Sequence, residues 1–154
     1  MRGEYMPDLD YSHAHLEPFS LSVELSREHR GLKVALPIML HGLDAFVAAL
    51  DEKLDLTENA YARLCAMPAI QVLHAPDLST IAFQLAGNQG DERNRLLMET
   101  VNAGRKVYLS GTMLNDQFTL RVTILSHRTG ADQIDIFFNE LERALTDIGQ
   151  ASSL

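Results

Sequence analysis

Apolar residues recur at helical spacing through much of the first half of the chain. A first helix is predicted from about Ser22 or Ser26 to His41, with Gly42 as its stop. A second, longer helix follows from Leu43 until Pro68, with Lys53 and acidic residues on its polar face. Its predicted apolar stripe comprises Phe46, Val47, Leu50, Leu54, Tyr61, Leu64 and Cys65. We expect Cys65 to be a small buried apolar residue.

The second half alternates short apolar runs with helical patterns. "IQVLHAP" and "STIAFQLA" flank Pro76-Asp77 as a predicted hairpin, and a helix with Leu96, Leu97 and Val101 inward follows. "KVYLSGTMLNDQFTLRVTIL", residues 106–125, predicts two strands joined at Asn115-Asp116. The last helix begins at a capping box of Thr129 and Asp132. The chain therefore predicts an α+β fold: two N-terminal helices, then a β-β-α-β-β-α unit whose four-stranded antiparallel sheet carries helices on one face.

Alternation along the last predicted strand separates its side chains into two faces. Phe118, Leu120 and Val122 should point toward the helices, which sends Thr119 and Arg121 the opposite way. Arg121 should therefore lie on the open face of the sheet. Tyr108 and Ser110 on the preceding strand are expected on the same face as Arg121, where they would form a polar patch suited to an anionic group.

Length and charge limit the function classes. A chain of 154 residues with 46% hydrophobic content fits one core, preceded by an extended N-terminal arm over residues 1–21. The net charge of −8 and the lack of any basic run argue against a nucleic-acid ligand. No apolar run approaches the roughly 20 residues of a membrane span and no signal peptide is recognisable, so the cytoplasm is the expected location.

From about Tyr5 onward the chain resembles the C-terminal small domain of the group II pyridoxal-phosphate-dependent amino-acid decarboxylases, the aromatic-amino-acid and glutamate decarboxylase family of aminotransferase-like fold. "ELSREHRGLK" and "HG", residues 24–33 and 41–42, are similar to one family stretch. "NRLL", "NAG", "YLSGT" and "FTLR" follow in the family's order and spacing. Each motif alone is weak, and their joint order is the specific signal. This chain departs from the pattern at Ala35, Pro37 and Gly111, and its Gly104 comes one residue before the usual glycine.

The resemblance implies that residues 22–150 form a domain without the catalytic and cofactor-binding groups of the family. In the family, the large domain carries the Schiff-base lysine, the aspartate that pairs with the pyridinium nitrogen, the group that stacks on the ring and the phosphate-binding loop. By the resemblance this chain begins after all of them, so we expect no bound cofactor and no catalytic residue in the chain alone. It would be a fragment, a split-gene partner or a remnant of a decarboxylase, associated with itself or with a missing large domain.

Individual residues keep two interpretations each. The resemblance makes Arg121 the candidate for binding the substrate carboxylate, and the alternative is a surface arginine that pairs with an acid or lies along Tyr108. Arg27, Arg30 and Lys33 form a basic helix edge that either docks to another domain or subunit or is simply solvated. His13 and His15 are two imidazoles, too few for a closed zinc site, so no metal site is predicted.

An alternative function also fits the pattern. The chain could be a free-standing ferredoxin-like module whose open sheet face dimerises or holds a small acidic metabolite. The sequence does not identify the amino acid that a parent decarboxylase would act on.

Overall fold

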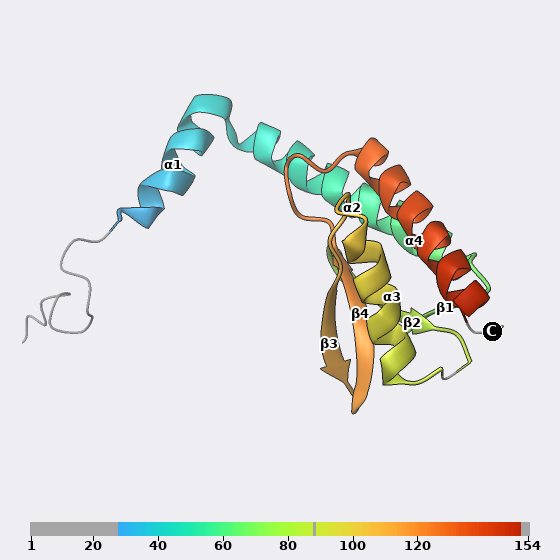
Figure 1. Cartoon of the computed structure of the whole chain (residues 1–154). Coiled ribbons are helices and arrows are strands. Elements are labelled where there is room, and N and C mark those ends of the chain that lie inside the picture. Colours follow the sequence, from blue (N-terminus) through green and yellow to red (C-terminus); the bar gives the residue numbers. More distant parts are fainter. Residues whose placement is uncertain (1–27, 88, 152–154) are drawn as a thin grey trace, which may run out of the picture. The chain divides into compact units, whose positions relative to one another are not determined.

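The computed structural model describes residues 28–87 and 89–151 (Figure 1). The chain divides between Gly42 and Leu43 into two compact units, which are described separately. The predicted arm, the start of the first predicted helix and the candidates His13, His15 and Arg27 lie outside the described residues.

The first unit contributes one helix, α1, Arg30–His41. It runs through Pro37 and is capped by Gly42, whose φ of 79° a glycine adopts readily and whose N–H donates to the Ile38 carbonyl at 2.9 Å. No residue of α1 is buried. Four apolar side chains on one side of the helix are between 45% and 80% exposed: Leu32, Leu36, Met39 and Leu40. Helix α1, taken by itself, therefore presents an apolar face.

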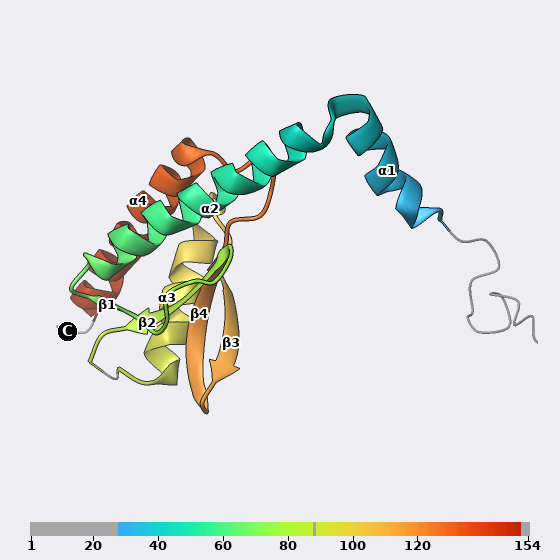
Figure 2. The ribbon, with the colours of Figure 1, turned by 180° about the vertical axis from the view of Figure 1, so that it is seen from behind.

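The second unit has the predicted α+β architecture (Figures 1 and 2). Its elements, in order, are α2 (Leu43–Cys65), β1 (Ile70–Val72), β2 (Thr80–Leu85), α3 (Asp91–Ala103), β3 (Ser110–Leu114), β4 (Gln117–Thr123) and α4 (Ala131–Ala151). The strands form one antiparallel sheet in the order β1-β2-β4-β3. Within the described residues no single helix is long and apolar enough to cross a membrane, and α1 and α2 reach those values only when counted together.

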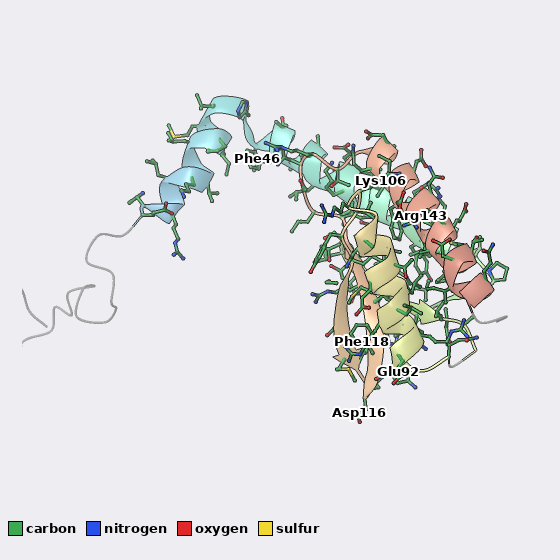
Figure 3. All side chains as sticks on the ribbon, viewed as in Figure 1. Phe46, Glu92, Lys106, Asp116, Phe118 and Arg143 are labelled. Atoms are coloured by element: carbon green, nitrogen blue, oxygen red, sulfur yellow. The ribbon has the colours of Figure 1, made fainter. Side chains whose placement is uncertain are left out.

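The β3–β4 hairpin turns where the sequence predicts. Leu114 pairs with Gln117, and the two residues between them, Asn115 and Asp116, have φ values of 49° and 62°. Positive φ at both central residues is the requirement of a tight hairpin turn, and Asn and Asp tolerate it better than other side chains. Asp116 lies at the tip of the hairpin (Figure 3).

One core joins α2, α3 and α4 to a single face of the sheet. Phe83 of β2 meets Phe137 of α4 edge to face, with ring centroids 6.4 Å apart, and Phe137 meets Phe138 at 4.9 Å. The largest side chains that are fully buried include Leu64, Ile81, Leu97, Leu120 and Leu141. Because each such side chain stabilises the fold by about 1.5–3 kcal/mol, this face fixes the register of every strand.

Leu97 and Val101 of α3 face inward as predicted, whereas Leu96 is 45% exposed, so its predicted inward position is wrong.

The buried stripe of α2 differs from the predicted one. Lys53, Thr57, Ala60 and Leu64 face the core, whereas Val47, Leu50 and Leu54 are exposed. Lys53 can be buried because its ammonium donates to the Thr129 carbonyl at 2.7 Å and pairs with Glu52 at 2.9 Å.

Cys65 is exposed, which contradicts the prediction of a buried residue. It follows the fully buried Leu64 in the last turn of α2. A step of about 100° around the helix carries Cys65 off the buried stripe.

The start of α4 also differs from the predicted capping box. The helix begins at Ala131, and the Gly130 N–H donates to Gln133 Oε1 at 2.7 Å. Gln133, three residues after Gly130, therefore takes the role that the sequence assigned to Asp132. A long amide side chain reaches back to the cap more easily than the short aspartate one position earlier.

Candidate functional site

The open face of the sheet is built around Arg121. In β4, Arg121 lies between Ala82 of β2 and Ser110 of β3 in register. The same face carries hydroxyl and amide side chains: Thr80, Thr112, Thr119, Thr123, Gln71 and Gln84, by the register of the strands. The Thr80 and Thr123 hydroxyls are hydrogen-bonded at 3.0 Å. Among the described residues of these paired positions, Arg121 supplies the cation.

Arg121 is held in place but remains accessible. Its side chain is exposed, and its Nε donates to Ser110 Oγ at 3.1 Å. That bond uses one of five guanidinium N–H donors, and the terminal nitrogens carry the other four. A planar fork fixed at Nε can give a carboxylate two parallel hydrogen bonds.

The three residues predicted to share this face are not placed alike. Arg121 and Ser110 are brought together by the β3–β4 register. Tyr108 lies two residues before β3 begins and is 81% exposed. The strand begins later than the sequence predicted, so a shared patch with Tyr108 stays a prediction. Thr119 of the same strand face is fully buried, because β4 is a central strand and its short side chain sits between neighbours such as Thr112.

Two asparagines of the family-like motifs act on the scaffold. Asn94 Oδ1 accepts the Leu85 N–H at the end of β2 at 2.8 Å, and its Nδ2 donates to the Gly90 carbonyl at 3.3 Å. Asn102 accepts the Leu109 N–H at 2.7 Å and donates to the Leu109 carbonyl at 3.0 Å. These side chains tie α3 to the strands on either side of it. No sequence prediction covers this role, although Asn94 falls on the same helical face as the inward Leu97.

An ion cluster joins the end of α3 to α4. Glu140 is buried and pairs with Lys106 at 2.8 Å and with Arg143 at 2.9 Å. Hydrogen bonds from Lys106 and then Arg143 lower the pKa of the Glu140 carboxyl, against the opposing effect of burial. Gly104 lies against this carboxylate, since a Cβ added there would overlap Glu140 Oε2. The Glu140 carboxylate therefore leaves no room for a side chain at position 104.

Arg105, the next residue, has a backbone conformation that is unfavourable for a residue other than glycine. Arg105 has a φ of 54°, in the left-handed region that favours glycine. The glycine that the family pattern expects one residue after Gly104 would fall at this position. The displaced glycine therefore avoids a clash at residue 104 and leaves a non-glycine residue in the strained conformation.

A second departure from the family pattern, Gly111, also has a packing reason. The ring of Phe118 occupies the space that a Cβ at Gly111 would need. The Arg95 guanidinium covers the same ring, 3.9 Å from its centroid.

The basic edge of α1 is described in part. Arg30 and Lys33 are exposed, and Lys33 pairs with Glu28 at 2.7 Å. Arg27 lies outside the described residues, so the full edge stays a prediction.

The lysines of the chain do not fit a pyridoxal phosphate site. Lys33 and Lys106 are exposed, and they pair with Glu28 and Glu140, respectively. The Lys53 ammonium already donates to the Thr129 carbonyl and pairs with Glu52. An imine-forming lysine needs a nearby carboxylate for the pyridinium nitrogen and a phosphate cradle in one enclosed pocket. None of these three lysines is placed in such a pocket.

Within the described residues no group of three or more His, Cys, Asp or Glu side chains is placed to hold a metal ion.

Comparison with known proteins relates the chain to decarboxylases. It is 29% identical over 107 residues to tyrosine decarboxylase 2 of Arabidopsis thaliana, which covers 66% of this chain and 20% of that protein. It is 26% identical over 117 residues to the aromatic-L-amino-acid decarboxylase of Sus scrofa, which covers 76% of this chain and 24% of that protein. The chain thus spans a fifth to a quarter of the length of these relatives.

A solved structure shows the same fold. The Oryza sativa protein TDC, in a crystal structure with PLP and tryptamine, superposes with a TM-score of 0.74 at 18% identity. The match covers 86% of this chain and 30% of that one. No family model matches the chain.

Proposed function

Sequence and fold relate this chain to the aromatic-L-amino-acid decarboxylases, and we propose that it is the C-terminal small-domain part of such a pyridoxal-phosphate-dependent carboxy-lyase, inactive on its own. The observation that carries the proposal is the match itself, which spans most of this chain but at most about a quarter of either relative named above. The positions of Lys33, Lys53 and Lys106 support the second half of it, since none suits an imine with the cofactor.

Within an intact enzyme, Arg121 would bind the carboxylate of the substrate. Its guanidinium is the cation of the open sheet face, and Ser110 orients it through Nε. A carboxylate bound this way would be held by two charge-assisted hydrogen bonds, which fix its orientation as well as its position. In the chain alone, Arg121 keeps a geometry suited to binding an anion but takes part in no reaction.

Further protein would complete the unit. The apolar side chains of α1 are exposed, and exposed apolar surface of this extent marks contact with another protein. The basic edge at Arg30 and Lys33 would add charge to that contact. The partner is a pyridoxal-phosphate-binding large domain or a second copy of this chain. The single cysteine fits a reducing compartment, and we include the cytoplasm in this proposal.

The experiment is to add pyridoxal phosphate to the purified chain, record the imine absorbance and treat the mixture with borohydride. We expect no imine band, no reduced lysine adduct and no carbon dioxide from aromatic amino acids or glutamate. A large domain of a related decarboxylase, expressed separately, is then added. Recovery of activity with the wild-type chain, but not with Arg121→Ala, would support the assigned role of Arg121. A stable adduct at one lysine of the chain alone would contradict the proposal.

A second function is favoured by the Arg121–Ser110 pair on a sheet face rich in hydroxyls. The chain would then be a binding module for a small carboxylate. Titration with glutarate, followed by NMR shifts of the β3 and β4 amides, tests it. Saturable shifts that disappear in Arg121→Ala would favour the module, and flat titration curves would exclude it.

A further inference from the structure

The first half of α2 exposes a continuous apolar stripe. Leu43, Val47, Leu50 and Leu54 are spaced by four, three and four residues, which places them on one side of the helix. They are 63%, 48%, 57% and 41% exposed. This stripe lies beside the buried face of α2 and is distinct from it.

The stripe leads into a cleft. Leu54, at the end of the stripe, and Tyr61, two turns further on, line a cavity of about 310 Å³ together with the loop between β1 and β2. Leu78 of that loop lines it too and is 71% exposed. An apolar side chain docked along the stripe could fill this cavity.

One edge of the stripe is acidic. At about 100° per residue, one side of the stripe carries carboxylates along its whole length. They are Asp44, Asp51, Asp55 and Glu58, all exposed. The lysine in this half of α2, Lys53, is buried on the other side and does not offset them. The stripe therefore suits a helix that is apolar on one side and basic along the adjacent edge.

Helix α1 has that pattern. Four of its exposed apolar residues, Leu32, Leu36, Met39 and Leu40, share one side, and Val34, which is 59% exposed, lies on the opposite side. Arg30 and Lys33 lie along the edge of the four-residue face by the same 100° step. The predicted N-terminal arm is a poorer match, because residues 1–21 contain four acidic side chains and one arginine. Charge complementarity thus selects α1 over the arm.

The connection between the two helices points to a second chain. Two consecutive helices that pack antiparallel are joined by a loop of about two to five residues, and only Gly42 separates α1 from α2. We propose that α1 of one copy docks on the α2 stripe of a second copy and receives that copy's α1 in return. The result is a two-fold symmetric dimer. This inference rests on the proposal above that α1 contacts further protein, and it identifies that protein as a second copy of this chain.

Complementary charge reversal tests the pairing. One variant carries Arg30→Glu and Lys33→Glu, and the other carries Asp51→Lys and Glu58→Lys. Each variant alone sets like charges against each other at both contacts. One exposed ion pair changes an equilibrium only a few-fold, but several pairs are reversed at once, so the dimer of each variant should be about tenfold weaker or more. A one-to-one mixture restores opposite charges at both contacts. We expect the mixture to form a heterodimer with the affinity of the wild-type dimer, measured by sedimentation equilibrium and native mass spectrometry.

Substitutions in the stripe provide the matched control. Leu50→Asp should abolish the dimer, whereas Leu96→Asp, the same change at a 45% exposed position of α3, should leave it intact. Circular dichroism checks that each variant keeps its helices. A monomeric wild-type chain, or a mixture of charge variants that stays monomeric, would overturn the inference and leave the stripe to a large domain. Neither result would affect the test with pyridoxal phosphate, so the two proposals can fail separately.

Discussion

Asn102→Ala probes the link between α3 and the residues that lead into β3. Asn102 makes two hydrogen bonds to the backbone of Leu109, at 2.7 Å and 3.0 Å. Leu109 is 1% exposed, so neither its N–H nor its carbonyl can turn to water without a local rearrangement. Each buried backbone group left without a partner costs about 1–3 kcal/mol. Alanine returns about 0.5 kcal/mol through its higher helix propensity. For the two groups together, the expected net loss is about 1.5–5.5 kcal/mol.

For a unit of this size, such a loss lowers the melting temperature by about 6 °C or more. Urea and thermal unfolding, followed by circular dichroism at one protein concentration, measure both quantities. Asn139→Ala is the control, because Asn139 is an exposed asparagine of α4 and its replacement should be neutral or slightly stabilising. If Asn102→Ala loses less than about 0.5 kcal/mol, the two hydrogen bonds do not fasten the loop as described.

The turn after α3 gives two further predictions. Arg105→Gly should raise the free energy of unfolding by about 0.5–1 kcal/mol because φ at this position is 54°, and a lower urea midpoint than wild type would contradict this. The lowered pKa of Glu140 means that its charged form stabilises the folded state above the ordinary glutamate pKa, and that this contribution is lost as the pH falls through the lowered value. The melting temperatures of wild type and Glu140→Gln should therefore differ at neutral pH and converge on acidification; curves that stay parallel would rule out Glu140 as the titrating group.

Local patterns predicted the elements that depend on neighbouring residues. The α+β order and the antiparallel hairpin at Asn115-Asp116 follow from periodicity and turn chemistry within short windows. The register that brings Ser110 to Arg121 follows from the same hairpin. This part of the candidate site could therefore be anticipated from the sequence.

The wrong assignments concern partners that are distant in sequence. Lys53 was placed on the polar side of α2, but its ammonium reaches the Thr129 carbonyl 76 positions later. No window along the helix contains that partner. Cys65 was grouped with Leu64 for the same reason, since the true buried stripe was rotated away from the predicted one. The scaffold role of Asn102 likewise depends on a loop that the pattern of α3 does not reveal.

Asn94 and Asn102 belong to the motifs that make the chain recognisable, yet among the described residues their side chains bond to the backbone of their own unit. A descendant that had lost all chemistry would still need them in order to fold. Sequence similarity at such residues therefore reflects the inherited fold, and it is equally high for an active enzyme and for an inactive relative. Telling the two apart requires side chains whose only use is the reaction.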